Sequence, residues 1–278
     1  MSRFLKYHGL GNDFVLLDRL DGGNPPAPEQ AIAACERRRG IGADGVLTVL
    51  PSELAAARMH VTNADGSVAE MCGNGLRCVA RHLAETRFPE ARELLVETGA
   101  GLKRCELHRH GGRVEEVTVE MGAPVLEPAR IPMAVSAERF VGGEIEVGGL
   151  RLRATAVSMG NPHLVLFGLD RRRAPELAPL LERHPLFPAR TNVELAEVCG
   201  DGLDVIVWER GCGFTQACGT GACAAMVAAV LEGRLQAGVE RPVKLAGGTL
   251  RVAVAAGLDG VRMRGPAARV FEGTTDLI

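Results

Sequence analysis

The chain contains one short motif twice, and this repetition constrains its fold more than any other feature. Cys72-Gly73-Asn74-Gly75 and Cys218-Gly219-Thr220-Gly221 each open a segment with the composition of a helix. Nine residues before each cysteine, a polar residue ends a run typical of a strand: Asn63 in the first case and Glu209 in the second. One copy could arise by chance, but two copies with matched surroundings predict duplicated domains that face one another.

The motif places a thiol where a helix begins. The first backbone N–H groups of a helix have no intrahelical acceptor, and the helix N-terminus carries a partial positive charge. We therefore expect the pKa values of Cys72 and Cys218 to lie below the value of about 8.5 of a free cysteine. The glycines let an anion approach the bare amides closely, which suits a carboxylate. These amides belong to Gly73, Asn74, Gly219 and Thr220.

Two such thiols on either side of one carbon suit an inversion by two bases. One cysteine, as thiolate, removes the α-proton of an amino acid, and the other, as thiol, delivers a proton to the opposite face. The helix amides stabilise the carboxylate as it gains enediolate character, as an oxyanion hole does. The sequence therefore predicts an epimerase that needs no cofactor and no metal ion.

Length and composition limit the remaining function classes. The 278 residues suffice for two domains, and 46% of them are hydrophobic, so a substantial core can form. A net charge of −2 argues against nucleic acid or an anionic membrane as partner. No apolar run reaches the roughly 18 residues of a membrane span, and the first residues lack a signal-peptide core. We expect a cytoplasmic protein whose eight cysteines are free thiols.

The order of elements indicates an α+β fold, rich in strands, with one long helix in each half. We expect the long helices at 73–86 and 219–232, and shorter ones at 29–39 and 175–183. A proline-containing stretch, 122–133, reads as a linker. Strands are expected at 3–7, 14–17, 46–50, 58–63, 94–98, 102–108, 114–121, 144–147, 151–158, 164–167, 203–208, 243–246, 249–255 and 260–264.

Other interpretations of the motif explain less. The cysteine spacings are not the close pairs of a structural zinc site. Gly219 to Ala224 matches a dinucleotide-binding fingerprint, but it follows a long turn rather than a strand. A cysteine hydrolase using His163 leaves the second thiol unexplained. An amino-acid-binding module without catalysis would not need both thiols, and α-carbon isotope exchange would distinguish it from an enzyme.

Several further residues have an ordinary structural interpretation. His163 lies in the turn-like sequence Gly160-Asn161-Pro162-His163, so solvation and a functional role are both open for it. Cys212 lies in a glycine turn and is expected to be structural. Buried, inert thiols are expected at Cys35, Cys78, Cys105, Cys199 and Cys223.

The chain resembles diaminopimelate epimerases over nearly its whole length. The resemblance rests on six motifs in order: His8 to Phe14, Asn63 to Ser67, Met71 to Gly75, Gly160 to His163, Glu209 to Gly211, and Ala217 to Gly221. It implies interconversion of LL- and meso-2,6-diaminopimelate without pyridoxal phosphate, for lysine and peptidoglycan synthesis. It also implies a homodimer of two-domain chains, with the active site in the cleft between two pseudo-symmetric domains. The domains implied are 1–125 with 264–278, and 126–263.

The resemblance also implies a role for individual residues. Cys72 and Cys218 match the acid/base pair, and His163 and Glu209 match residues that assist them. The reacting carboxylate would be bound by Gly73, Asn74, Gly219 and Thr220. The substrate-binding positions, which largely hold the distal amino-acid end, are Asn12, Asn63, Asn161, Asn192, Glu209 and Arg210.

The sequence departs from some members of this family at three places. Gly45 stands where some carry Gln, so a side-chain contact is absent there. Phe271 stands at a dimer-contact position where some carry Tyr, so the ring is kept and the hydroxyl is not. Phe214-Thr215-Gln216 replaces Glu-Thr-Gln. Proline and hydroxyproline racemases are the alternative family, since they share the two cysteines. Their first motif typically has His after Cys-Gly, where this chain has Asn74.

Overall fold

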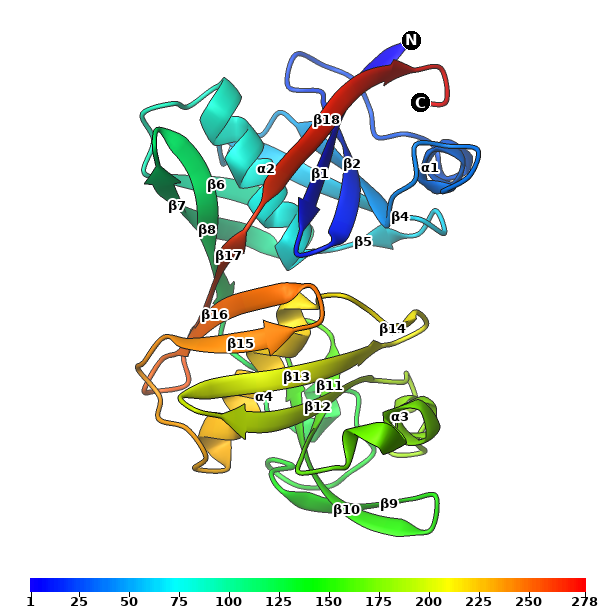
Figure 1. The fold of residues 1–278 in the computed structure, drawn as a ribbon, viewed down its shortest axis with the longest axis vertical. Coiled ribbons are helices and arrows are strands. Elements are labelled where there is room, and N and C mark those ends of the chain that lie inside the picture. The colour runs from blue at the N-terminus through cyan, green and yellow to red at the C-terminus, as the bar shows by residue number, and fades with distance from the viewer. The chain divides into compact units, whose positions relative to one another are not determined.

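The computed structural model describes all 278 residues, which form two compact units. The first unit consists of Met1–Glu120 and Arg264–Ile278, and the second of Met121–Met263. Each unit is a strongly curved mixed sheet with one long helix packed against it, as Figure 1 shows.

In the first unit the strands pair in the order β18-β1-β2-β3-β4-β6-β7-β8, with the short β5 also on β4. The strands are β1 (Ser2–Gly9), β2 (Asn12–Asp18), β3 (Gly45–Leu50), β4 (Ala57–Asn63), β5 (Val68–Ala69), β6 (Glu93–Thr98), β7 (Gly101–His110), β8 (Arg113–Gly122) and β18 (Ala268–Thr275). The helices are α1 (Pro28–Cys35) and α2 (Gly73–Thr86).

In the second unit the order is β9-β10-β11-β12-β13-β15-β16, with the short β14 also on β13. The strands are β9 (Gly143–Val147), β10 (Leu150–Ser158), β11 (Pro162–Phe167), β12 (Asn192–Cys199), β13 (Gly202–Glu209), β14 (Gly213–Phe214), β15 (Arg241–Leu245) and β16 (Gly248–Val254), and β17 (Val261–Pro266) leads back to the first unit. The helices are η1 (Pro128–Arg130), η2 (Arg171–Arg173), α3 (Ala174–Glu182) and α4 (Gly219–Leu231).

The two units have the same internal topology. Along β1, β2, β3, β4, β6 and β7, successive pairs are antiparallel, parallel, antiparallel, parallel and antiparallel. The strands β10, β11, β12, β13, β15 and β16 repeat that pattern. The helix pairs α1/α3 and α2/α4 fall at the same points of the chain order. The repetition seen in the sequence motif therefore extends to the whole of each unit.

Both long helices form where the motif predicts them, and both are buried. In α2 the fully buried residues Leu76, Val79, Ala80, Leu83 and Ala84 follow the spacing of one helix face. That face contacts strands from β1 to β7. Helix α4 is apolar on all sides, and its run from Ala222 to Ala229 is buried throughout, as a helix enclosed by its own sheet must be.

The structure differs from the sequence-based prediction in four longer segments, apart from the unpredicted two-residue strands β5 and β14 and three-residue helices η1 and η2. Helix α1 ends at Cys35 rather than residue 39, because the Glu36 carboxylate accepts hydrogen bonds from the amides of Arg38 and Arg39 in a tight turn. Residues 122–133 are not a free linker: Ile131 and Met133 are buried in the core of the second unit. Strands β12 and β18 were not predicted, since charged residues interrupt both patterns.

The chain termini lie in the same unit. Strand β18 pairs with β1, and the buried Arg77 of α2 donates a hydrogen bond to the carbonyl of Pro266 (3.1 Å) just before that strand begins. The N-terminal ammonium group lies 3.3 Å from Asp276 Oδ1. No helix combines the length and the apolar character needed to cross a membrane.

Candidate functional site

Cys72 is the N-cap residue of α2. Its backbone is extended (φ −140°, ψ 111°), and its sulfur accepts a hydrogen bond from the Gly75 amide at 3.4 Å. Its carbonyl receives the first bond of the helix, from the amide of Leu76 at 2.8 Å. The thiol is half-buried. The sulfur therefore sits at the positive end of a helix dipole, as the motif predicts.

Cys218 has the same local structure at α4. Its backbone angles are φ −117° and ψ 112°, and its sulfur accepts from the Gly221 amide at 3.3 Å. A second contact, to Thr220 Oγ1, is 3.4 Å long. Unlike Cys72, this residue is only 5% exposed. The duplicated motif thus builds the same thiol cap in each unit, with different burial.

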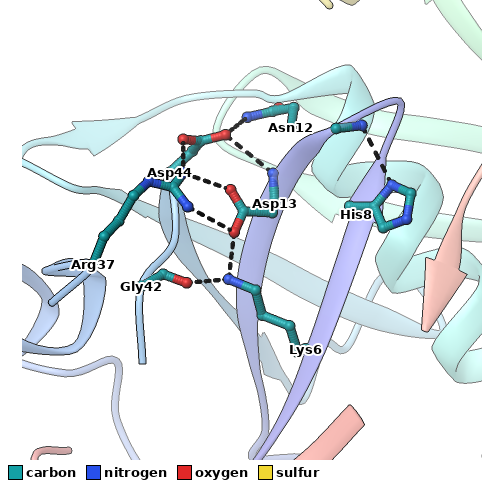
Figure 2. A network of polar contacts seen from close by, with 8 residues as sticks. Lys6, His8, Asn12, Asp13, Arg37, Gly42 and Asp44 are labelled. Atoms are coloured by element: carbon teal, nitrogen blue, oxygen red, sulfur yellow. Dashed lines mark hydrogen bonds and ion pairs between the residues drawn. The ribbon is translucent and has the colours of Figure 1, made fainter. Parts of the chain in front are cut away.

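In the first unit, the candidate substrate residue Asn12 is held from two sides. Its Oδ1 accepts a hydrogen bond from Nδ2 of Asn74 (3.0 Å), and its Nδ2 donates to Oδ2 of Asp44 (2.8 Å). Figure 2 shows Asn12 above Asp44, whose same oxygen also accepts from the amide of Asp13. Because Asn74 is the second residue of α2, this chain of contacts fixes Asn12 relative to the Cys72 helix.

An ion-pair network with a buried lysine and two exposed members, Arg37 and Asp44, anchors that arrangement. Lys6 is 7% exposed, and its ammonium contacts Asp13 Oδ2 at 2.5 Å and the carbonyl of Gly42. Arg37 bridges Asp13 and Asp44, at 2.7 Å to each (Figure 2). Burial raises the pKa of Asp13, but the hydrogen bonds and charges of Arg37 and Lys6 outweigh burial and hold that pKa below its usual value.

Asn63 ends β4 opposite Gly45 of β3. Its side-chain Nδ2 donates to Ser67 Oγ at 3.0 Å across the following turn. Gly45 itself has no room for a side chain, because a Cβ there would lie 2.9 Å from the carbonyl oxygen of Thr62. The close approach of β3 and β4 thus favours glycine at this position.

In the second unit, His163 is not a solvated turn residue. It lies in β11, is completely buried, and is paired with Asn192 of β12. Its Nδ1 lies 2.7 Å from Oε1 of Glu194, which is also completely buried, and its Nε2 lies 3.0 Å from Oδ1 of Asn161. The turn interpretation fails because Pro162 begins the strand rather than ending a turn.

Asn192 connects three segments of backbone. Its Nδ2 donates to the carbonyl of Pro162 (2.8 Å), and its Oδ1 accepts from the amide of Arg210 (2.8 Å). The Arg210 side chain is exposed, and its Nη1 donates to the carbonyl of Ala189 at 3.0 Å. Asn192 therefore positions Arg210 and the start of β11.

Glu209 ends β13, and its Oε1 accepts a hydrogen bond from Thr215 Oγ1 at 2.6 Å.

The expectation of a lowered pKa is wrong for Cys218. Burial raises that pKa well above its usual value, and the negative charges of Glu209 and Glu194 raise it further. The hydrogen bonds from Thr220 and Gly221 lower it, but by less. Tertiary burial here outweighs the helix N-terminus.

The remaining cysteines are free thiols. Cys35, Cys78, Cys105 and Cys223 are buried, as predicted, but Cys199 is exposed because it borders the turn between β12 and β13. Cys212 is also exposed, in the turn after β13.

Phe271 of β18 is 47% exposed and packs edge-on against Phe4, with ring centroids 6.0 Å apart. No group of three or more His, Cys, Asp or Glu side chains is arranged to hold a metal ion.

Two residues that shape these sites were not found from the sequence. The sequence around Asp44 indicates a turn, and Glu194, in Thr191-Asn192-Val193-Glu194, looks like a solvent-exposed charged residue. The one available signal for Glu194 is a carboxylate between apolar residues in a short strand, which is unusual in a buried position. Its partner His163 lies 31 residues away in the sequence, so no local pattern marks the contact.

The sequence matches the family model described as diaminopimelate epimerase over residues 4–127 and 155–270. The curated diaminopimelate epimerase of Moorella thermoacetica is 51% identical over 274 residues, covering 97% of this chain and 98% of that protein. The one from Desulforudis audaxviator is 49% identical over 274 residues, covering 97% and 98%.

Among solved structures, a probable proline racemase from Agrobacterium radiobacter K84 superposes with a TM-score of 0.74. The superposition covers all of this chain and 94% of that one, at 18% identity. A likeness at this identity concerns the fold alone, and it confirms the predicted two-domain α+β class.

Proposed function

This chain belongs to the diaminopimelate epimerase family and is an isomerase, and on that premise we propose that Cys72 and Cys218 are its two acid/base groups. The family match confirms the resemblance predicted from the motifs. The reaction is the interconversion of LL- and meso-2,6-diaminopimelate. The observation that supports the two-thiol assignment is that both sulfurs cap the long helix of their unit in the same way.

The proposed mechanism moves two protons. One cysteine thiolate takes the α-proton and becomes a thiol, and the electron pair stays on the substrate as an enediolate. The other cysteine thiol donates its proton to the opposite face of the α-carbon and becomes a thiolate. The substrate leaves inverted, and the two sulfurs have exchanged their protonation states.

The helix starts are proposed to hold the reacting carboxylate. Amides at the first positions of a helix lack intrahelical acceptors and favour negative charge. As charge moves onto the carboxylate, these donors stabilise it without reorganising. The residues are Gly73, Asn74, Gly219 and Thr220.

The distal amino-acid end is proposed to bind to a set of side chains that are held in place before substrate arrives. Asn12 is fixed by Asp44 and Asn74, and Asn161 by His163. Arg210 supplies a permanent cation that can bind a carboxylate through two parallel hydrogen bonds. The complete set is Asn12, Asn63, Asn161, Asn192, Glu209 and Arg210, with His163 and Glu209 also assisting the thiols.

Two variants and one control test the thiol pair. Purified protein is incubated with LL-diaminopimelate in heavy water, and the product is examined by chiral analysis and for deuterium at the α-carbon. Cys72→Ala and Cys218→Ala should each abolish epimerisation, yet each should still eliminate hydrogen halide from a halogenated analogue, because elimination needs one base. Cys199→Ala, at an exposed thiol, is the matched control and should turn over normally. Full epimerisation by either active-site variant would refute the assignment.

We also propose a cytoplasmic homodimer with Phe271 at the contact. All eight cysteines are free, which fits a reducing compartment. Phe271 is 47% exposed on strand β18, an aromatic side chain that a partner subunit would cover. Phe271→Asp should convert dimer to monomer in sedimentation analysis. The control Val68→Asp, at a 62% exposed residue of β5, should not.

A further inference from the structure

The shared topology makes it possible to compare corresponding positions of the two units. Phe14 of β2 is paired with Gly45 of β3, and His163 of β11 is paired with Asn192 of β12. Two residues further along, Leu47 of β3 therefore corresponds to Glu194 of β12. The helices agree with this correspondence: a Cβ on Gly75 would lie 2.7 Å from Leu47 Cδ2, and one on Gly221 would lie 2.7 Å from Glu194 Oε1.

The two units thus differ in chemistry at matched places. Behind the Cys72 cap the corresponding residues are Phe14 and Leu47, which are apolar and buried. Behind the Cys218 cap they are His163 and Glu194, which are joined by a 2.7 Å contact and are completely buried. A buried carboxylate is costly unless it is paired. Its presence in only one of two duplicated sites points to a role that the other thiol does not need.

Glu194 is incompletely satisfied. Oε1 contacts His163, but Oε2 is buried and has no hydrogen-bond partner. One proton on Nε2 and one between Nδ1 and Oε1 satisfy both contacts of the imidazole, and the pair is then neutral. Within this neutral pair the negative charge lies on the Glu194 carboxylate, whose Oε1 approaches Gly221 of α4, and the imidazole shares the compensating proton. Burial raises the pKa of Glu194, the charge and hydrogen bond of His163 oppose this rise, and Glu209 adds to it.

That charge lies beside the Cys218 sulfur. A Cβ on Gly221 would lie 2.7 Å from Glu194 Oε1 and 3.3 Å from Cys218 Sγ, so these two atoms are within about 6 Å of one another. The second carboxylate, Glu209 at the end of β13, acts on Cys218 in the same direction. Two negative groups close to a buried sulfur oppose a third negative charge on it.

Other charged side chains on the strands around α4 have partners elsewhere. Lys244 of β15 pairs with Asp204 at 3.3 Å, and Arg251 of β16 pairs with Glu240 at 2.7 Å. The groups that favour a thiolate on Cys218 are the Gly221 amide and the Thr220 hydroxyl, both neutral donors. The charge around Cys218 is therefore set by His163, Glu194 and Glu209.

We propose that Glu194, acting with His163, is a positioning residue that keeps Cys218 a thiol in the free enzyme. Cys218 then begins the cycle as proton donor and Cys72 as base. The proposal rests on the two-thiol function proposed above. It makes the two thiols of the duplicated motif unequal. The isomer whose α-proton faces Cys72 can react with the free enzyme directly, because Cys72 is already the base. The other isomer requires one proton to move from Cys218 to Cys72 first.

The test measures each thiol separately in the free enzyme. Iodoacetamide alkylation of Cys72 and Cys218 is followed against pH by peptide mass spectrometry, in wild type, Glu194→Gln and Glu194→Leu. The leucine variant copies the residue found at the corresponding place of the first unit. Leu195→Ala is the control for lost stability, because Leu195 is the next residue of β12 but packs in the apolar core. The pH profile of kcat/KM for LL-diaminopimelate is recorded for the same proteins.

We expect the alkylation midpoint of Cys218 to lie above that of Cys72 in wild type. In both Glu194 variants it should fall by about one pH unit. One unpaired charge at about 6 Å, with an effective dielectric constant of about 20, would give about two units, and the proton shared with His163 offsets part of that effect. The Cys72 midpoint should not move, and the alkaline limb of kcat/KM should shift to lower pH. Leu195→Ala should change neither midpoint.

A Cys218 midpoint at or below that of Cys72 in wild type would overturn the proposal without any variant. An unchanged Cys218 midpoint in the Glu194 variants, or an equal shift of both thiols, would also overturn it. The alkylation measurements need no turnover, so they are independent of the cysteine-to-alanine test of the reaction itself.

Discussion

Replacement of Gly221 by alanine tests the geometry around Cys218 most directly. The added methyl group would lie 2.7 Å from Glu194 Oε1, 3.3 Å from Cys218 Cβ and 3.3 Å from its sulfur. The carboxylate must therefore move, and its 2.7 Å contact with His163 Nδ1 must lengthen or break. Gly75→Ala is the matched variant in the first unit, where the methyl group meets Leu47 Cδ2 at 2.7 Å and Cys72 Cβ at 3.5 Å.

The two variants should have similar free energies of unfolding and different activities. Overpacking a core costs about 1–3 kcal/mol, while alanine in place of glycine inside a helix returns about 1 kcal/mol. Both proteins should thus lose about 0–2 kcal/mol. In Gly75→Ala the neighbour is the end of a flexible leucine, so the Cys72 site should survive. In Gly221→Ala the neighbour is tied to His163, so kcat should fall at least about tenfold, equivalent to about 1.4 kcal/mol.

Urea unfolding and steady-state kinetics at several pH values measure the two effects separately. The activity loss in Gly221→Ala should appear mainly in kcat, because the displaced contact is that of Glu194 with His163; Asn161, which His163 also contacts, adds a smaller rise in KM. Equal activity losses in the two variants would mean that both act through general helix distortion. Wild-type kcat in Gly221→Ala would mean that the Glu194–His163 contact has no part in catalysis. Either result would refute the reasoning.

Two further predictions concern the polar networks. Asp13→Asn leaves the buried Lys6 facing Arg37 without its carboxylate and should lower the free energy of unfolding at neutral pH by about 3 kcal/mol. The folded-state pKa of Asp13 is depressed, so its contribution to wild-type stability is present above the unfolded-state pKa and is lost as the pH falls through the folded-state pKa. The free energies of unfolding of the two proteins, measured with urea from pH 7 to 3, should therefore converge. A difference that stays constant over this range would contradict the prediction. Arg210→Met should lower kcat/KM for diaminopimelate by about 100-fold with little change in stability, since the side chain is exposed. Deuterium incorporation into proline, lysine and glutamate is the comparison, and proline exchange as fast as that of diaminopimelate would favour a proline racemase instead.

Strand and helix positions followed largely from local patterns. The apolar spacing that starts at Leu76 has the helical period, and the cysteine–glycine start marks its first turn, so α2 was predicted at 73–86 and is found there. Strand β12 escaped prediction because Glu194 and Glu197 read as solvent-facing charges, although Glu194 is buried. A local pattern cannot show that a charged residue will find its partner on another strand.

The candidate site divides in the same way. The amino-acid order alone determined which thiols cap helices, since an N-cap depends on the residues directly around it. It also determined the family, because the six motifs lie in order along the chain. The tertiary structure alone decided that Cys218 is buried close to Glu194 and Glu209, and that its pKa is raised rather than lowered. Burial and long-range charge depend on which strands become neighbours, and parallel pairs such as β11 and β12 join residues about 30 positions apart through packing that no local pattern encodes.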